Sequence, residues 1–158
     1  MKHINHFLGY FILFVVLNIG SNALYAQTNQ QYILNYTPLA KQLSQEYKIP
    51  VAIILGIAVF ESDYGRSKVA KRLNNHFGIE GHNHHIYKTR YRYFANVKES
   101  YIFFCKMITK RGYYINLKGN VDYGAWIKAM SKSGYSEMPE VWAKRLNQII
   151  KNNKLNEL

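Results

Sequence analysis

Apolar residues fill one stretch of the chain and recur at helical spacing over much of the rest. Residues 51–60 read Val-Ala-Ile-Ile-Leu-Gly-Ile-Ala-Val-Phe and contain no charged side chain. Pro50 precedes this run and Gly65 comes closely after it, which suits the first helical position and the position just past a helix end. The pattern therefore predicts a buried helix from Pro50 to Glu61.

Weaker amphipathic patterns predict five further helices and one hairpin. Apolar stripes with steps of three and four residues are typical of helices that bury one face. We expect these helices at residues 36–47, with Pro38 in the first turn, and at 67–72, 97–110, 122–132 and 139–151. Alternation of Ile86, Tyr91 and Tyr93 with polar residues favours a small β-hairpin, and the tail from Asn152 is expected to fray. The predicted fold class is mainly α (α+β).

Glu61 ends the apolar run and shares a helix face with Ile54, Ile57 and Ala58. A carboxyl at the rim of such a face is poorly solvated, so its neutral form is favoured and its pKa should rise. A carboxylic acid that keeps its proton near neutral pH can act as a general acid. The alternative interpretation is that Glu61 is simply the last, solvated residue of a core helix.

Four separated motifs indicate a resemblance to a known family. They are Glu-Ser-Asp-Tyr-Gly at 61–65, Asn-Asn-His-Phe-Gly-Ile-Glu-Gly at 74–81, Tyr-Phe followed by Glu-Ser-Tyr within 93–101, and Gly-Tyr followed by Trp-Ala-Lys-Arg-Leu within 134–146. Over roughly residues 36–152 the chain resembles the bacterial endo-β-N-acetylglucosaminidases of glycoside hydrolase family 73. That family includes the flagellar peptidoglycan hydrolase domain.

The resemblance implies a lysozyme-like fold, in which a helical lobe and a small β-hairpin lobe flank a groove with Glu61 at its floor. The family's Glu-Ser-x-x-Gly glutamate is the general acid. Glu61 would therefore protonate the β-1,4 glycosidic oxygen between N-acetylglucosamine and N-acetylmuramic acid. Five residues at matching positions are predicted to bind substrate: Tyr64, Asn75, Tyr93, Tyr113 and Tyr135. Sugars stack on aromatic faces and hydrogen-bond to phenol groups, although packing is an equal alternative for Tyr113 and Tyr135.

The chain departs from the family in its second acidic residue. Many members carry one in the β-hairpin, but residues 82–93 contain neither aspartate nor glutamate. Glu80, which stands where the family usually has lysine, is the remaining catalytic candidate. Glu137 and Glu140 are interpreted as acids that suit the start of the last helix. Without Glu80, the substrate's own N-acetyl group or a water positioned by tyrosine would complete the reaction.

A group of histidines raises the question of a metal site, which the sequence does not favour. These residues are His76, His82, His84 and His85. Zinc sites need ligands at converging spacing, usually with acidic or thiolate partners, and neither Cys-x-x-Cys nor His-Glu-x-x-His is present. We therefore expect no metal and no other cofactor. Together with the basic residues of 88–92, the histidines are expected to form a basic wall that attracts polyanionic glycan.

The first 26 residues have the layout of a secretory signal peptide. Lys2 precedes an apolar core at 7–20, and small residues at 21–26 offer a cleavage site. This core is shorter than the ~20 residues needed to span a bilayer, so a retained membrane anchor is the second interpretation. We expect residues 27–158 to form a single catalytic domain that is periplasmic or secreted.

The formal net charge of +12 suggests an anionic partner. We expect this partner to be the glycan strands of peptidoglycan, and we expect neither nucleic acid binding nor a lasting membrane anchor. Cys105 is the single cysteine and forms no internal disulfide, and the protein is expected to be a monomer. The leading hypothesis is a peptidoglycan hydrolase. A catalytically degenerate wall-binding protein and a lytic transglycosylase are the alternatives.

Overall fold

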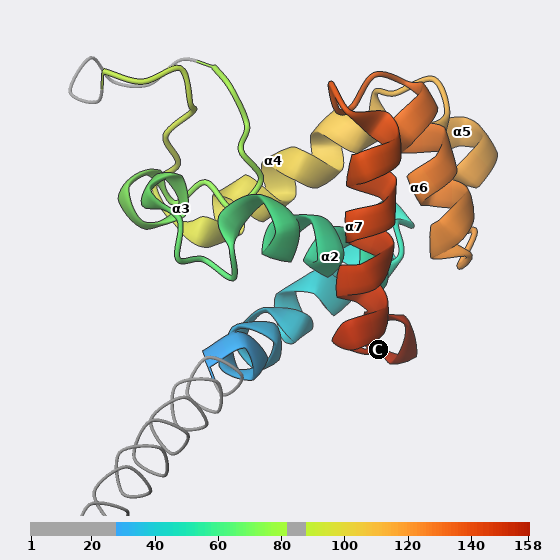
Figure 1. The fold of residues 1–158 in the computed structure, drawn as a ribbon, viewed down its shortest axis with the longest axis horizontal. Helices are drawn as coiled ribbons and strands as arrows, with labels where there is room; N and C mark the ends of the chain where they lie inside the picture. The colour runs from blue at the N-terminus through green and yellow to red at the C-terminus, as the bar shows by residue number, and fades with distance from the viewer. Residues whose placement is uncertain (1–27, 82–87) are drawn as a thin grey trace, which may run out of the picture.

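A computed structural model describes residues 28–81 and 88–158 of the chain. A first helical segment covers residues 28–47, and shorter helices make up most of the remaining chain (Figure 1). In chain order these are α2 (Val51–Ser62), α3 (Lys68–Leu73), α4 (Val97–Thr109), α5 (Tyr114–Leu117), α6 (Tyr123–Lys132), α7 (Pro139–Asn152) and the short 3-10 helix η1 (Leu155–Glu157). The prediction of a mainly helical fold is confirmed.

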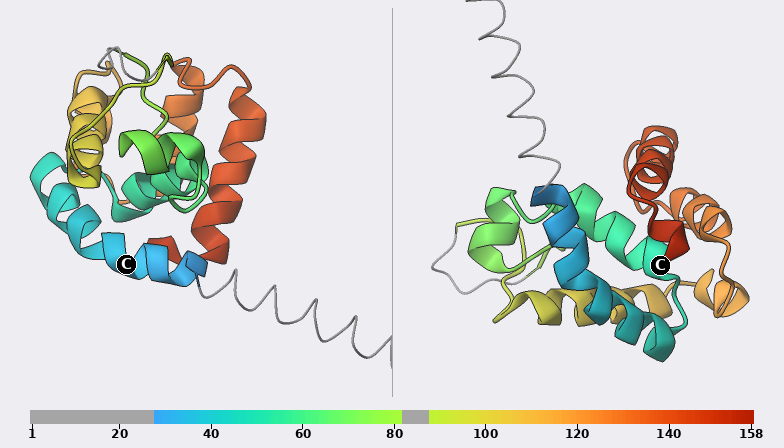
Figure 2. Two further views of the ribbon diagram at one scale, coloured as in Figure 1. Left: turned by 90° about the vertical axis from the view of Figure 1, so that its left-hand side faces the viewer. Right: turned by 90° about the horizontal axis from the view of Figure 1, so that it is seen from below.

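The central element of the fold is α2. Every residue from Ala52 to Val59 is buried, and a helix that is apolar on all sides needs cover on every face. Figure 2 shows α2 in the middle of the molecule, between the 28–47 segment, α4, α6 and α7. The buried helix predicted at residues 50–61 is thus confirmed, with Pro50 as the residue that precedes its first turn.

Helix α7 packs on both α2 and α6. Its approach to α2 is very close at Gly56, where a β-carbon would lie 2.9 Å from Ile150 Cγ1 and 3.1 Å from Leu146 Cδ1. The missing side chain of Gly56 therefore lets α7 lie directly on α2. This contact fixes the position of α7 relative to the end of α2, where Glu61 lies.

The first helix is longer than the sequence pattern predicts. The pattern places Pro38 in its first turn, whereas the chain is helical from residue 28 through Pro38 to residue 47. Proline lacks an N–H and leaves the carbonyl four residues earlier without its helical donor. Pro38 and Leu34 are both exposed, so water can reach that carbonyl and the helix continues.

The predicted β-hairpin lobe is not shown by the described residues. Glu80 and Tyr91 form one isolated antiparallel bridge, flanked by backbone hydrogen bonds between residues 79–81 and 90–92. Within the described ranges this bridge is the only β-pairing. Residues 82–87, which include Ile86 of the predicted hairpin, lie outside them.

The prediction that the tail from Asn152 frays is wrong. Lys154 adopts the left-handed conformation with φ of 51° and turns the chain into η1. This turn brings Leu155 into the core, where it is 1% exposed, and η1 contacts α2. The tail is therefore part of the cover that α2 requires.

No helix in the described part of the chain combines the length and apolar character needed to cross a bilayer. The predicted signal peptide at 1–26 lies outside the described residues, so its cleavage and the retained-anchor alternative both stay predictions.

Candidate active site

Glu61 is positioned by a left-handed turn that ends α2. Asp63, Tyr64 and Gly65 have φ values of 50°, 52° and 76°, a conformation that is uncommon for residues other than glycine. The Ser62 hydroxyl stabilises the turn. It donates to the backbone carbonyl four residues earlier at 2.6 Å and accepts from the N–H of Gly65 at 2.8 Å. The Glu-Ser-x-x-Gly motif therefore ends the helix one residue after Glu61.

The side chain of Glu61 is half-buried and lines an open cavity of about 630 Å³. Burial raises the pKa of its carboxyl, and the side chain of Trp142 opposes part of this rise. The buried Nε1 of Trp142 has no partner at ordinary hydrogen-bond distance among the described residues, so its effect on the carboxyl is weaker than that of a regular hydrogen bond. The result is a carboxyl whose neutral form is favoured, as the sequence led us to expect.

The loop of residues 75–79 packs against the carboxyl of Glu61. Gly78 has a φ of +61°, and a β-carbon there would lie 3.3 Å from Glu61 Oε2. Asn75 holds the loop in place, because its amide donates to two backbone carbonyls at 2.8 and 2.9 Å and accepts from the N–H of Ile79 at 3.0 Å. Asn75, predicted to bind substrate, is buried and lies outside the cavity lining that the described residues form. These contacts give Asn75 a role in holding the loop, and its predicted contact with substrate stays a prediction.

Aromatic side chains form the cavity wall near Glu61. Tyr135 and Trp142 both line the cavity, with ring centroids 5.1 Å apart and ring planes tilted by 45°. Burial, with a contribution from the nearby charge of Glu61, raises the pKa of Tyr135 well above its usual value. Its phenol therefore keeps its proton. Of the five residues predicted to bind substrate, all of them described, Tyr135 alone lies in the lining of this cavity.

Tyr64, Tyr93 and Tyr113 lie outside the lining, as far as the described part of the chain defines it. The hydroxyl of Tyr64 donates to Asn153 Oδ1 at 3.2 Å, which ties the motif turn to the end of α7. Tyr113 packs edge-on against Trp126 with centroids 6.5 Å apart, and burial raises its pKa to about 12. These contacts give Tyr64 and Tyr113 roles in packing, and their predicted contact with substrate stays a prediction.

Two further carboxylates line the cavity, Glu80 from the 79–81 segment and Glu137 from the α6–α7 connection. Oε1 of Glu80 lies 3.1 Å from Nε of Arg90, and both side chains are largely exposed. A hydrogen bond with Tyr91 raises the pKa of Arg90, and the charges of Glu80 and, more weakly, Glu137 add to this. The guanidinium therefore lies within electrostatic reach of both acids.

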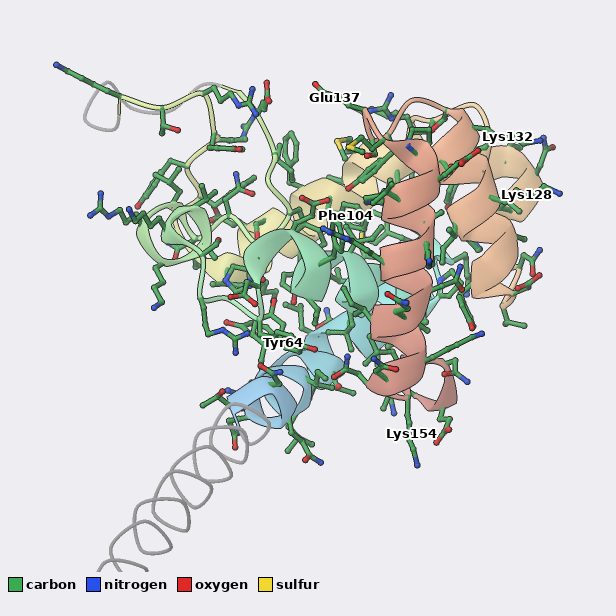
Figure 3. All side chains as sticks on the ribbon, viewed as in Figure 1. Tyr64, Phe104, Lys128, Lys132, Glu137 and Lys154 are labelled. Atoms are coloured by element: carbon green, nitrogen blue, oxygen red, sulfur yellow. The ribbon has the colours of Figure 1, made fainter. Side chains whose placement is uncertain are left out.

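Sequence reasoning missed the position of Glu137. It treated this residue as an acid at a helix start, whereas α7 begins at Pro139 with Met138 as its N-cap. Figure 3 shows Glu137 on the connection beside the first turn of α7. Its place two residues after Tyr135, which the resemblance puts in the groove, is the signal that could have located it.

His76 lies apart from this cavity, in a buried network of phenol groups. Its Nδ1 is 2.8 Å from the hydroxyl of Tyr32, which is 3.0 Å from the hydroxyl of Tyr101. Burial lowers the pKa of His76 to about 4, so its ring is neutral at neutral pH. Across residues 28–81 and 88–158, no three metal-binding side chains converge. The other histidines of the predicted basic wall, at 82–85, lie outside these ranges.

Fold and site together define a class of protein. A carboxylic acid at the end of a buried central helix, facing an open cavity with aromatic walls, is the arrangement of a lysozyme-like glycosidase. The chain belongs to the Glucosaminidase family, described as mannosyl-glycoprotein endo-beta-N-acetylglucosaminidase, whose sequence model matches residues 37–155. The resemblance to glycoside hydrolase family 73 is thereby confirmed, and the protein is placed among the glycoside hydrolases.

Two solved structures share this fold. The catalytic domain of the autolysin Auto from Listeria monocytogenes aligns with a TM-score of 0.69 at 19% identity, over 82% of this chain and 86% of that chain. A chain in a type VI secretion system effector-immunity complex from Pseudomonas protegens aligns with a TM-score of 0.60 at 19% identity, over 80% of this chain and 94% of that chain. No curated protein matches the chain.

Proposed function

We propose that this protein is a peptidoglycan hydrolase that cleaves the β-1,4 bond between N-acetylglucosamine and N-acetylmuramic acid, with Glu61 as the general acid. The observation that carries the proposal is the half-buried Glu61 carboxyl, which has a raised pKa and faces an open cavity. Family membership supports a glycosidic bond as the target. The fold shared with an autolysin catalytic domain supports cell-wall glycan as the substrate that contains this bond.

In the proposed reaction, Glu61 gives its proton to the glycosidic oxygen as the bond breaks. The carboxylate that remains gains from the Trp142 indole, which favours the ionised form. Tyr135 keeps its phenol proton and can donate it to a sugar hydroxyl or to the acetamide of the substrate. Burial therefore favours the acid before the reaction, and Trp142 favours its conjugate base afterwards.

We propose Glu80 as the second catalytic carboxylate, since it lines the same cavity from a different segment. An ionised Glu80 would stabilise the oxocarbenium-like centre or activate a water. Its backbone bridge to Tyr91 supports the proposal that 79–81 and 90–92 begin the small β lobe of the groove. If a Glu80→Gln variant keeps wild-type turnover, the acetamide of the substrate takes this role instead.

The test of Glu61 is its replacement by glutamine, which keeps the size of the side chain and removes the acidic proton. We expect Glu61→Gln to lose about 100-fold or more of the cell-wall digestion measured with purified walls, because general acid catalysis contributes at least that much. Glu46→Gln is the matched control, since Glu46 is exposed on the 28–47 helix and should digest walls like wild type.

Product analysis by mass spectrometry separates the alternatives. Hydrolysis of the proposed bond leaves N-acetylglucosamine at the new reducing end. Anhydro-muramic ends would contradict hydrolysis and indicate a lytic transglycosylase. Wall binding without any released product, unaffected by Glu61→Gln, would contradict catalysis and indicate a wall-binding protein.

We also propose that the protein is exported, with residues 1–26 removed as a signal peptide and 27–158 acting as the catalytic domain outside the cytoplasm. The net charge of +12 suits the anionic cell wall as a partner. The mature protein recovered from periplasm or medium should begin near residue 27 on N-terminal sequencing. A membrane-bound product that still carries residues 1–26 would contradict export by cleavage.

A further inference from the structure

The N-cap and first turns of α7 present exposed apolar side chains to the cavity. Met138 and Val141 are 63% and 42% exposed, and both line the same cavity as Glu61. Large apolar side chains that stay exposed beside a catalytic acid are well placed to be covered by a ligand. Arg145 lines the cavity one turn further along the same helix. Val141 and Arg145 lie four residues apart on one face of α7, and Met138, the N-cap residue of the helix, precedes Val141 by three residues. We call these three residues the α7 shelf.

The charge on the α7 shelf is available for a ligand. Arg145 is exposed, and within the described residues it makes no ion pair. By contrast, Arg90, which lines the same cavity, is paired with Glu80 at 3.1 Å. Arg145 comes seven positions after Met138, so the shelf is roughly 10 Å long. It therefore offers an aliphatic surface with a free guanidinium at one end.

This chemistry suits a short peptide better than a sugar. Sugar rings prefer flat aromatic faces, and those are provided by Tyr135 and Trp142 next to Glu61. Flexible aliphatic side chains such as methionine adapt to small methyl-bearing residues. A guanidinium with five N–H donors matches a carboxylate. A peptide with alanine methyl groups and free carboxylates is complementary to both parts of the shelf.

We propose that the α7 shelf binds the stem peptide attached to the muramic residue beside the scissile bond, so that the enzyme prefers peptide-bearing glycan to bare glycan. The proposal rests on the proposed function, because the shelf and Glu61 line one cavity and a substituent next to the cleaved bond would lie against α7. Arg145 would pair with a carboxylate of the peptide, and Met138 and Val141 would contact its methyl groups.

The test compares two soluble glycan substrates of equal length, one carrying stem peptides and one from which an amidase has removed them. We expect the wild-type kcat/KM to be roughly fivefold or more higher for the peptide-bearing glycan, the size of one ion pair at an exposed site with some added apolar contact. In Arg145→Ala and in Val141→Ser this ratio should fall towards one, mainly through a higher KM on the peptide-bearing substrate. Lys144→Ala, an exposed neighbour outside the cavity lining, should keep the wild-type ratio.

A peptide-bearing substrate with amidated carboxylates gives a second measurement. If Arg145 pairs with a carboxylate, amidation should lower the kcat/KM of wild type by the same factor as the Arg145→Ala substitution does on the substrate with free carboxylates. Amidation should not lower the kcat/KM of Arg145→Ala any further. A wild-type ratio near one, or an Arg145→Ala variant with an unchanged ratio, would overturn the proposal. Failure of the proposed function looks different, because wild type would then cleave neither glycan.

Discussion

At the scale of a single residue, the carboxyl of Glu61 experiences two opposing influences. Burial favours its neutral form, and the indole of Trp142 favours its ionised form, with burial the larger. A general acid works only while protonated, so activity should fall as the pH rises through this raised pKa. The pKa of one side chain thus sets the upper pH limit of the proposed reaction.

Replacing Trp142 with phenylalanine tests this balance. Trp142→Phe keeps an aromatic ring in the cavity wall and removes the N–H that lowers the pKa of Glu61. We expect the pKa to rise further, and the basic limb of the kcat/KM profile to move to higher pH. Trp126→Phe is the control, because its Nε1 donates to the carbonyl of Asn120 at 2.8 Å. A limb that stays in place in Trp142→Phe, or moves to lower pH, would contradict the assignment.

Residues differed in how far the sequence could locate them. Glu61 was identifiable because it combines a motif with the end of an apolar helix, and both are local features. Met138, Val141 and Arg145 were not, because the cavity that they line is formed by segments far apart in the chain. The hydrogen bonds by which Asn75 holds the 75–79 loop could not be predicted either, because their partners are backbone groups that only the folded loop brings together.

At the scale of elements, prediction succeeded where burial is dictated by composition. The run at 51–60 is apolar on every side and has no stable position except the centre of a fold. Prediction failed where the tertiary environment decides, either through a long-range contact or through exposure to water. The tail is ordered because Leu155 packs in the core with α2, and the first helix continues through Pro38 because both Pro38 and Leu34 face water.

The crossing of α2 and α7 gives a prediction at this scale. Alanine at Gly56 would gain about 1 kcal/mol of helix propensity, but its β-carbon would lie 2.9 Å from Ile150 Cγ1. Overpacking of this kind costs about 1–3 kcal/mol, so Gly56→Ala should lower the free energy of unfolding in urea. Gly112→Ala, where no described residue other than its chain neighbours lies within 4 Å of the new methyl group, should stay within about 0.5 kcal/mol of wild type. A Gly56→Ala variant more stable than wild type would contradict the close packing of these helices.

At the scale of the whole molecule, the buried His76 and the half-buried Glu61 give stability opposite dependences on pH. The folded pKa of His76, about 4, lies below the ordinary value of 6.5. As the pH falls from 6.5 to 4, the unfolded chain gains a proton that the folded protein does not bind, and stability is lost. The raised pKa of Glu61 acts the other way, because stability is lost as the pH rises through it. A single pH curve therefore contains both contributions.

The His76→Gln variant isolates the first contribution. Glutamine does not titrate and can still hydrogen-bond to the hydroxyl of Tyr32. Wild type should lose roughly 3 kcal/mol more of its free energy of unfolding between pH 6.5 and pH 4 than His76→Gln loses. Urea unfolding of both proteins at several pH values measures the difference. Equal losses in the two proteins would show that His76 takes up its proton as readily in the folded state.

Part of the cover of α2 is synthesised long after α2 itself. Its neighbours α7 and η1 come after α3, α4, α5 and α6 in chain order. The apolar helix α2 therefore leaves the ribosome well before these two elements can pack against it. Until then the nascent chain cannot complete its core. If the protein is exported as proposed, this order of elements delays completion of the core and keeps the chain longer in the unfolded form that a secretion channel accepts.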